Sequence, residues 1–218
     1  MKTLTTKNFR NCFCGLALIL LSAGSVLAGD QTEKLRNEKV LVVEQTLAPG
    51  DTVSMPADRA GVVVYFGAGL IESTSSQGKL QTETVKRGDV VFRAPQAGPL
   101  KNAGSGPLRV VWTGYLGNGS SETWGVAGLA PNYKLLFENQ YGRVYDIKIA
   151  AGKYEPLHTH HDRVVVCLSG AELEHTLQDG RKEPATLKTD EIAWRRGVTH
   201  IGHNLGKTDL WVIALEPK

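Results

Sequence analysis

The stretch RVVVCLSGA (163–171) decides the fold, because a counterpart, GVVVYFGAG (61–69), lies 102 positions earlier in the chain. Both are short runs rich in β-branched residues that end at glycine, as is typical of a buried strand followed by a turn. The same offset aligns four more pairs without a gap: TLAPG (46–50) with KIAAG (148–152), SQGK (76–79) with QDGR (178–181), VKRGDVVFR (85–93) with LKTDEIAWR (187–195), and NAGSGPLRVVW (102–112) with NLGKTDLWVIA (204–214). One offset for all five pairs indicates a duplicated unit of about 75 residues.

Each unit has the pattern of a β-protein. Its apolar runs are short and are separated by glycine, proline or Asp-Gly. The turn LQDGR (177–181) predicts a β-hairpin, since Asp-Gly tolerates the positive φ that such turns need. No segment has a clear apolar stripe at helical spacing. We therefore expect an all-β fold in which each unit is a sandwich or a barrel.

The N-terminus has the pattern of a secretory signal peptide. Three cations within the first ten residues precede the apolar run CFCGLALILL (12–21), and SVLA (25–28) offers small side chains at the cleavage positions. The apolar run is too short to span a membrane. We therefore expect residues 1–28 to be removed and the protein to be periplasmic or secreted.

Removal of this segment changes the charge and the cysteine count. The segment carries three cations and no acids, so the net charge falls from +3 to 0 and indicates neither a nucleic-acid nor a membrane partner. Cys12 and Cys14 are also removed, which leaves Cys167 alone and allows no internal disulfide. Three valines precede Cys167, so we expect it to be buried.

The remaining chain divides into two units and their connections. The Gly-, Ser- and Pro-containing stretch at 116–136 interrupts the strand pattern. We expect an extended or mobile N-terminal arm at 29–37, a first barrel at 38–115, a linker at 116–137 and a second barrel at 138–218.

The second unit carries a candidate metal site. His158 and His160 are two residues apart in an extended segment, so both side chains face the same side. His200 follows forty residues later in another strand-like run. Three imidazoles that meet inside a barrel would suit one divalent ion of iron, manganese, nickel or zinc, with a position open to water. The alternative is that these are core or surface histidines with ordinary hydrogen bonds.

The spacing of these residues resembles a known family. Gly152, five residues, then His158-x-His160, followed by His200-x3-Asn204, is similar to the two motifs of the cupin superfamily. The resemblance covers nearly all of the chain after residue 28, and the second unit looks like small bacterial cupin-domain proteins. It implies two tandem β-barrels of jelly-roll type, a bicupin. Because this fold supports many chemistries, function must be argued from the site.

The chain departs from the cupin pattern at one ligand. Metal-binding cupins usually add a glutamate seven residues before a glycine, and counting back from Gly170 gives Arg163. A guanidinium cannot ligate a metal ion. Either Arg163 helps to hold an anionic substrate against the ion, or it turns outward and pairs with Asp162 or Glu172. Asp190, where glycine is usual, should alter only the shape of its loop.

Other residues near the motif are weaker candidates. We consider Arg163, Cys167 and Trp194 as substrate-binding residues and leave the catalytic residues unassigned. Asp162 and Glu191 are the carboxylates considered as a general base.

The three other histidines are not expected to be ligands. His203 has the opposite parity to His200 on a strand, His161 is a neighbour of the site, and His175 is expected on a solvated strand face.

The first unit lacks the ligands. The positions equivalent to His158, His160 and His200 are Pro56, Asp58 and Gly98. We expect the first barrel to be a packing partner of the second, as in a pseudo-dimer. A metal-free ligand pocket there is the alternative.

These observations leave three functional hypotheses. The first is a metal-dependent enzyme with dioxygenase-like chemistry that acts on a small, anionic organic molecule. The second is a non-catalytic protein that binds a metal or a small ligand, and the third is a structural module with residual histidines. All three are compatible with a homodimer.

Overall fold

The computed structural model describes residues 31–75 and 77–218, and every regular element in this range is a β-strand. The expected signal peptide, residues 1–28, lies outside the described residues. Within the described range, no helix is long and apolar enough to cross a membrane.

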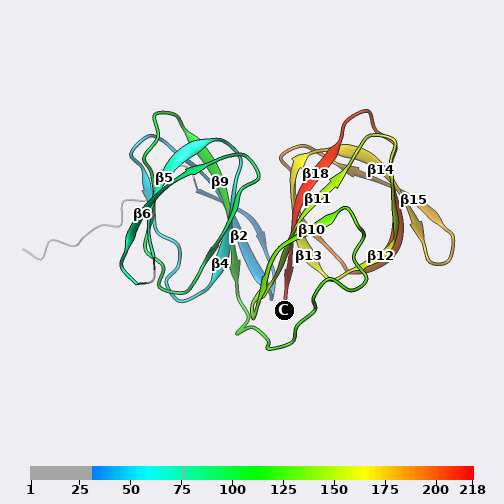
Figure 1. Ribbon diagram of the computed structural model, residues 1–218, viewed down its shortest axis with the longest axis horizontal. Helices are drawn as coiled ribbons and strands as arrows, with labels where there is room; N and C mark the ends of the chain where they lie inside the picture. The colour runs from blue at the N-terminus through cyan, green and yellow to red at the C-terminus, as the bar shows by residue number, and fades with distance from the viewer. Residues whose placement is uncertain (1–30, 76) are drawn as a thin grey trace, which may run out of the picture.

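The strands form two barrels that lie side by side (Figure 1). The first barrel consists of β1 (Gln31–Arg36), β2 (Val40–Leu47), β3 (Thr52–Val53), β4 (Gly61–Tyr65), β5 (Gly69–Thr74), β6 (Leu80–Val85), β7 (Val90–Arg93), β8 (Leu100–Asn102) and β9 (Leu108–Tyr115). The second consists of β10 (Tyr133–Asn139), β11 (Gly142–Ile149), β12 (Tyr154–His160), β13 (Arg163–Ser169), β14 (Ala171–Leu177), β15 (Lys182–Leu187), β16 (Ile192–Arg195), β17 (Val198–Asn204) and β18 (Leu210–Pro217).

The two barrels have the same topology. Each has a five-stranded sheet, in the orders β1-β2-β9-β4-β7 and β10-β11-β18-β13-β16, and a four-stranded sheet, in the orders β3-β8-β5-β6 and β12-β17-β14-β15. Their registers also agree, since Val43 pairs with Trp112 and Tyr145 pairs with Ala214, each 102 positions further along. The predicted all-β fold of two tandem barrels is therefore confirmed. The hairpin between β14 and β15 is confirmed as well, with Gly180 at a φ of 83°.

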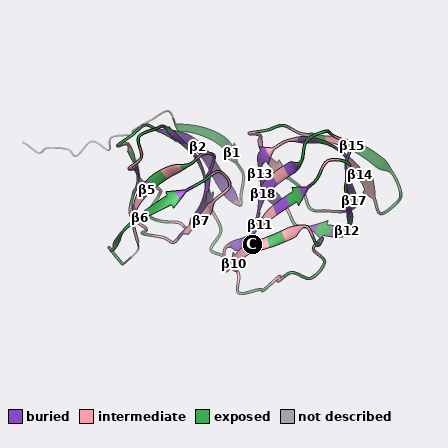
Figure 2. Cartoon of the chain, turned by 45° about the horizontal axis from the view of Figure 1, so that its top comes forward, coloured by how far each residue is buried: buried purple, intermediate pink, exposed green. Residues whose placement is uncertain are grey.

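The valine runs are apolar throughout because their strands are covered on both faces. Val62 and Val64 in β4, like Val164 and Val166 in β13, belong to one core shared between the five-stranded sheets of the two barrels. Val165 faces the interior of its own barrel. Figure 2 shows buried residues, in purple, on the strands where the two barrels face each other. Strands buried on both faces lose the alternation of apolar and polar residues, which is the pattern that RVVVCL shows.

Asp190 and Gly88, which occupy equivalent loops of the two barrels, both have positive φ, at 68° and 84°. Each packs against the partner barrel at equivalent positions: a Cβ on Gly88 would lie 2.2 Å from Trp211, and Asp190 pairs with Arg109 at 2.8 Å. Asp190 also accepts a hydrogen bond from Arg87 at 2.7 Å. The usual glycine is thus replaced by an aspartate that joins the two barrels through two arginines.

The structure moves two of the expected boundaries. Residues 31–36, expected in an extended or mobile arm, form the edge strand β1 and pair with β2. Tyr133, expected in the linker at 116–137, begins β10, which pairs with β11. The strand at the end of the linker has mixed polarity and follows a stretch rich in Gly and Ser, so the sequence pattern did not predict it.

Glu138 on β10 holds the segment that connects the barrels. Its carboxylate accepts hydrogen bonds from the backbone N–H groups of Trp124 and Gly125, at 2.6 and 2.8 Å, and pairs with Lys218 at 2.8 Å. Burial acts to raise the pKa of Glu138, but the ammonium and the two N–H groups outweigh it and lower the pKa to about 2.

This depressed pKa predicts an acid-dependent loss of stability. A carboxyl group whose pKa is lowered by folding stabilises the protein above its ordinary value of 4.5, and this contribution is lost as the pH falls towards 2. We expect the denaturation midpoint to fall less between pH 6 and pH 3 in Glu138→Gln than in the wild type. Equal falls in both proteins would contradict this role.

Candidate metal centre

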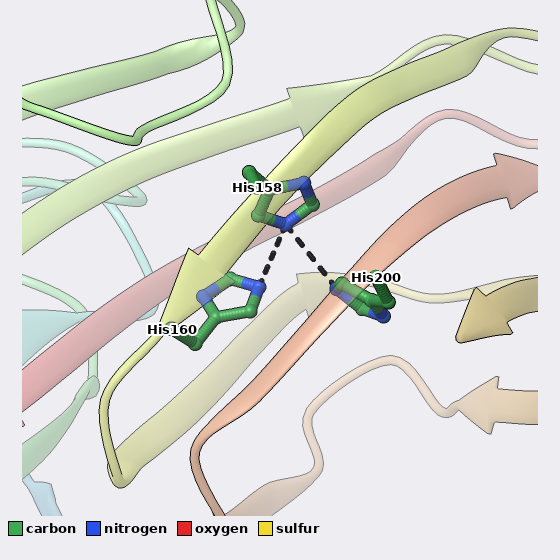
Figure 3. Close-up of side chains that lie close together, drawn as sticks. All are labelled: His158, His160 and His200. Carbon is green, nitrogen blue, oxygen red and sulfur yellow. Dashed lines mark hydrogen bonds between the residues drawn. The ribbon is translucent and has the colours of Figure 1, made fainter. Parts of the chain in front are cut away.

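Three buried histidines of the second barrel lie on neighbouring strands of its four-stranded sheet. His158 and His160 belong to β12, and His200 belongs to β17, which pairs antiparallel with β12. Side chains alternate along a strand, so His158 and His160 point inward while Leu157 and Thr159 are exposed. Because His200 is the register partner of His158, the three rings meet inside the barrel (Figure 3).

The ring nitrogens converge on one point. Nε2 of His158 lies 2.9 Å from Nε2 of His160 and 3.2 Å from Nε2 of His200. Nδ1 of His158 lies 2.8 Å from the carbonyl oxygen of Pro156. A carbonyl oxygen only accepts, so Nδ1 donates the hydrogen and Nε2 of His158 presents a lone pair to the cluster.

The surroundings lower the pKa of two of these imidazoles, those of His160 and His200. Burial lowers the pKa of His160 far below its ordinary value, and the positive charge of Arg163 lowers it further. Burial, followed by the neighbouring His175 and His158, lowers the pKa of His200 to about 3. Neutral imidazole is the form that binds a metal ion, so these two side chains are available as ligands at neutral pH.

One divalent ion fits this set of donors. One potential ligand atom from each histidine lies within 4.8 Å of the others. Imidazole binds zinc at about 2.0–2.1 Å, so neighbouring ligands of one ion lie about 3 Å apart, as the Nε2 atoms do here. His158, His160 and His200 could therefore hold one divalent metal ion, and imidazole suits zinc, iron or nickel.

A pocket of about 280 Å³ adjoins the histidines. His160, His200, Arg163 and Glu155 supply polar groups to its lining, and most of the remaining wall is aliphatic. A concave, largely apolar pocket with a few convergent polar groups is typical of a site for a small molecule.

Arg163, at the beginning of β13, points into this pocket. Its side chain is buried, and its Nη1 donates to the carbonyl oxygens of His161 and Arg196, at 3.3 and 3.2 Å. Among the described residues, no carboxylate lies within ion-pair distance of its guanidinium. The outward alternative is therefore wrong: Asp162 instead pairs with Arg196 at 3.1 Å.

Two equivalent positions carry residues of opposite size in the two barrels, and this difference makes room for Arg163. The equivalent of Arg163 in the first barrel is Gly61, where a Cβ would lie 2.4 Å from Nε1 of the buried Trp112. The equivalent of Trp112 in the second barrel is Ala214, which lines the pocket. The indole fills the first barrel above a glycine, whereas the alanine leaves space in the second barrel for a guanidinium and a pocket.

Two predicted pocket residues lie elsewhere. Cys167 is fully buried in the core of the second barrel, as expected for a thiol after three valines, but it is not part of the pocket lining. Trp194 pairs with Val164 and packs against the core shared by the two barrels. Register partners in a sheet point to the same face, and Val164 faces the shared core. Trp194 therefore also points away from the pocket. Neither residue lines the pocket.

The carboxylates considered as a general base are also held outside the pocket. Asp162 accepts a hydrogen bond from the backbone N–H of Gly197 at 2.7 Å, which lowers its pKa. Glu191 accepts from the N–H of Lys188 and pairs with Arg195, both at 2.9 Å. Neither of them belongs to the pocket lining.

The three remaining histidines divide differently from the prediction. His161 stacks on Trp124 with the ring centroids 4.0 Å apart, and His203 stacks on Tyr154 at 3.6 Å, so neither joins the cluster. His175 was expected on a solvated face, but it lines the pocket with its ring centroid 4.1 Å from that of His200. Burial, followed by the charge of Arg163, lowers the pKa of His175 to about 4.

Two residues of the site were not predicted. The hydroxyl of Tyr133 lies 3.0 Å from Nε2 of His158 and 3.2 Å from Nε2 of His160. Glu155 is buried, and its Oε2 lies 3.9 Å from Nε2 of His158. Tyr133 lay in the expected linker, and Glu155 precedes the histidines instead of following them. The charged residue at an inward position of β12 was the available signal for Glu155.

Comparison with solved structures identifies the fold. The chain is similar to a cupin 2 conserved barrel domain protein from Leptotrichia buccalis, with 15% identity, 88% of this chain and 90% of that chain covered, and a TM-score of 0.58. It is similar to AerE from Microcystis aeruginosa, with 12% identity, 88% and 97% covered, and a TM-score of 0.59. It is also similar to oxalate decarboxylase from Bacillus subtilis, a protein described with Mn(II) centres, with 13% identity, 86% and 75% covered, and a TM-score of 0.54.

These likenesses show the fold of the chain. No family model and no curated protein sequence matches the chain. The structural matches extend over both barrels, so the chain has the cupin fold in tandem. Its second barrel carries a three-histidine cluster that could hold a metal ion.

Proposed function

We propose that this bicupin is an exported, metal-dependent enzyme with dioxygenase-like chemistry that acts on a small anionic organic molecule. The observation that carries the proposal is the buried guanidinium of Arg163, which lines the same pocket as His160 and His200. A buried charge is costly unless it has a partner. An anionic substrate would supply that partner.

Different residues of the pocket would bind the substrate, exclude water and transfer a proton. Arg163 would bind a carboxylate or enolate of the substrate through its free donor groups, and the aliphatic wall around Val165 and Leu173 would hold the carbon skeleton and exclude water. Glu155 is placed to accept or donate a proton beside the histidines. When bound, a metal ion would supply Lewis-acid or redox chemistry at this point.

The structural neighbours support the class of substrate. Oxalate decarboxylase is named for oxalate, a small carboxylate, and its likeness to this chain extends over both barrels. The pocket beside the three-histidine cluster and the charge of Arg163 would suit such an anion here.

We expect the turnover test to depend on Arg163. The purified protein would be loaded in turn with iron, manganese, nickel and zinc and screened against phenols, diketones and small carboxylates, with products followed by mass spectrometry. For any substrate found, Arg163→Gln should lower kcat/KM by about 10²- to 10³-fold, since it removes a charge-assisted contact. The control is Arg181→Gln, which lies on the exposed β14–β15 hairpin and should retain full activity.

The outcomes distinguish an enzyme from a binding protein. If no metal yields a product in the screen, the enzymatic proposal fails. Tight binding of an anion without any product would then favour the non-catalytic alternative.

Export is a separate part of the proposal and rests on the sequence of residues 1–28. Expression of the full chain followed by N-terminal sequencing of the exported fraction should find Gly29 as the first residue. Retention in the cytoplasm with residues 1–28 intact would contradict it.

A further inference from the structure

We propose that the phenol oxygen of Tyr133 is a fourth protein ligand of the metal ion, so that the centre consists of three histidines and one tyrosinate. This inference rests on the metal centre of the proposed function and names a ligand that the cupin motifs do not contain. Tyr133 begins β10, on the sheet that faces the histidine-bearing strands across the barrel.

The geometry points to ligation. Oη of Tyr133 lies 3.0 Å from Nε2 of His158 and 3.2 Å from Nε2 of His160. These separations match those between the Nε2 atoms themselves, which are 2.9 and 3.2 Å. Neighbouring ligands of one ion at about 2.0–2.1 Å are separated by about 3 Å, so the phenol oxygen lies at the spacing of one more ligand.

Hydrogen bonding alone satisfies this arrangement poorly. With its Nδ1 donating to Pro156, Nε2 of His158 has a single lone pair and can accept one hydrogen. It nevertheless lies within 3.2 Å of three polar atoms, which are Oη of Tyr133, Nε2 of His160 and Nε2 of His200. One cation among these atoms would satisfy all their lone pairs at once.

The site also contains a place for the phenol proton. On ligation the O–H bond breaks, the oxygen keeps the electron pair, and the proton passes to the carboxylate of Glu155. Glu155 is buried, its Oε1 accepts a hydrogen bond from Asn132 at 2.9 Å, and its Oε2 faces His158 at 3.9 Å. The tyrosinate charge would compensate the ion where the usual cupin glutamate is replaced by Arg163.

The first barrel has no equivalent of Tyr133 and Glu155. Glu155 lies opposite Gly202, where a Cβ would be 2.4 Å from Oε2 of Glu155, so only glycine leaves room for the carboxylate. The equivalent pair in the first barrel is Val53 opposite Leu100, both in an apolar core. The residue equivalent to Tyr133 there is Gln31. Tyr133 and Glu155 therefore occur in the barrel that carries the three histidines, and their equivalents in the barrel without these histidines are Gln31 and Val53.

The test is spectroscopic. The full protein without its signal peptide would be loaded with iron(II) and oxidised to iron(III), because iron(III) bound to tyrosinate absorbs visible light by charge transfer. We expect the wild type to show this band and Tyr133→Phe to lose it while it retains stoichiometric iron. The matched control is Tyr154→Phe on β12, since Tyr154 is 68% exposed and its ring stacks on His203 outside the cluster.

A second measurement covers the case in which Tyr133→Phe loses its fold or its iron. Resonance Raman spectra of the wild type, excited in the visible band, should show tyrosinate vibrations that shift when the protein contains ring-deuterated tyrosine. Stoichiometric iron without such a band, or a band that persists in Tyr133→Phe, overturns the tyrosine ligand and leaves the histidine centre standing. Failure of the wild type to bind iron or any of manganese, nickel and zinc overturns both.

Discussion

Replacement of both His158 and His160 by alanine is expected to abolish metal binding by this protein. Two of the three imidazoles that converge through Nε2 would be lost, and one histidine cannot hold a divalent ion in a protein site of this kind. Protein purified without chelator should contain close to one metal ion per chain in the wild type. The double variant should contain less than about a tenth of that amount. Elemental analysis by mass spectrometry would measure both.

The chain offers its own control for this experiment. His203→Ala and His161→Ala remove histidines of the same segments that stack on Tyr154 and Trp124 outside the cluster. Both variants should keep the metal content of the wild type. Metal that remains in the double variant would place the binding site elsewhere, and a metal-free wild type would favour the structural module over both other hypotheses.

Replacement of Glu216 by leucine is expected to be the most destabilising single change in the second barrel. Glu216 is fully buried, and its Oε2 accepts hydrogen bonds from Arg143 at 2.6 Å and from Tyr145 at 3.3 Å. Its Oε1 accepts from the backbone N–H of His161 at 3.0 Å. Removal of one partner of a buried ion pair leaves the other charge uncompensated and costs about 3–5 kcal/mol.

Urea denaturation would measure this loss. The free energy of unfolding should fall by about 3–5 kcal/mol in Glu216→Leu. The control is Asp179→Asn, since the pair between Asp179 and Arg181 is exposed on a hairpin and should leave the denaturation midpoint unchanged. A change in Glu216→Leu no larger than in the control would show that Arg143 finds another partner.

Much of the fold follows from the sequence because duplication leaves a periodic record. The offset of 102 residues aligned the valine runs of β4 and β13, and the structure shows these strands in the same sheet position. The ends of the barrels were harder to predict. β1 and β10 are edge strands with polar residues on one side, so neither shows the continuous apolar run of the inner strands.

The candidate ligands could also be predicted from sequence, because their positions depend on local geometry. His158 and His160 share a face through strand alternation, and the family spacing identified His200. Tyr133, Glu155 and His175 reach the site by packing across the barrel and by pairing between strands. No spacing within one segment encodes such contacts, so they could not be predicted.

The sequence by itself determined that the chain is a tandem β-protein and that only its second unit keeps three histidines at ligand spacing. Only the tertiary structure decided the direction of Arg163. That direction depends on volume: Trp112 fills the first barrel above Gly61, whereas Ala214 leaves the equivalent space of the second barrel open to the guanidinium. Close packing allows one of these side chains in that space but not both, and the exchange occurs between residues that lie about fifty positions apart in each unit.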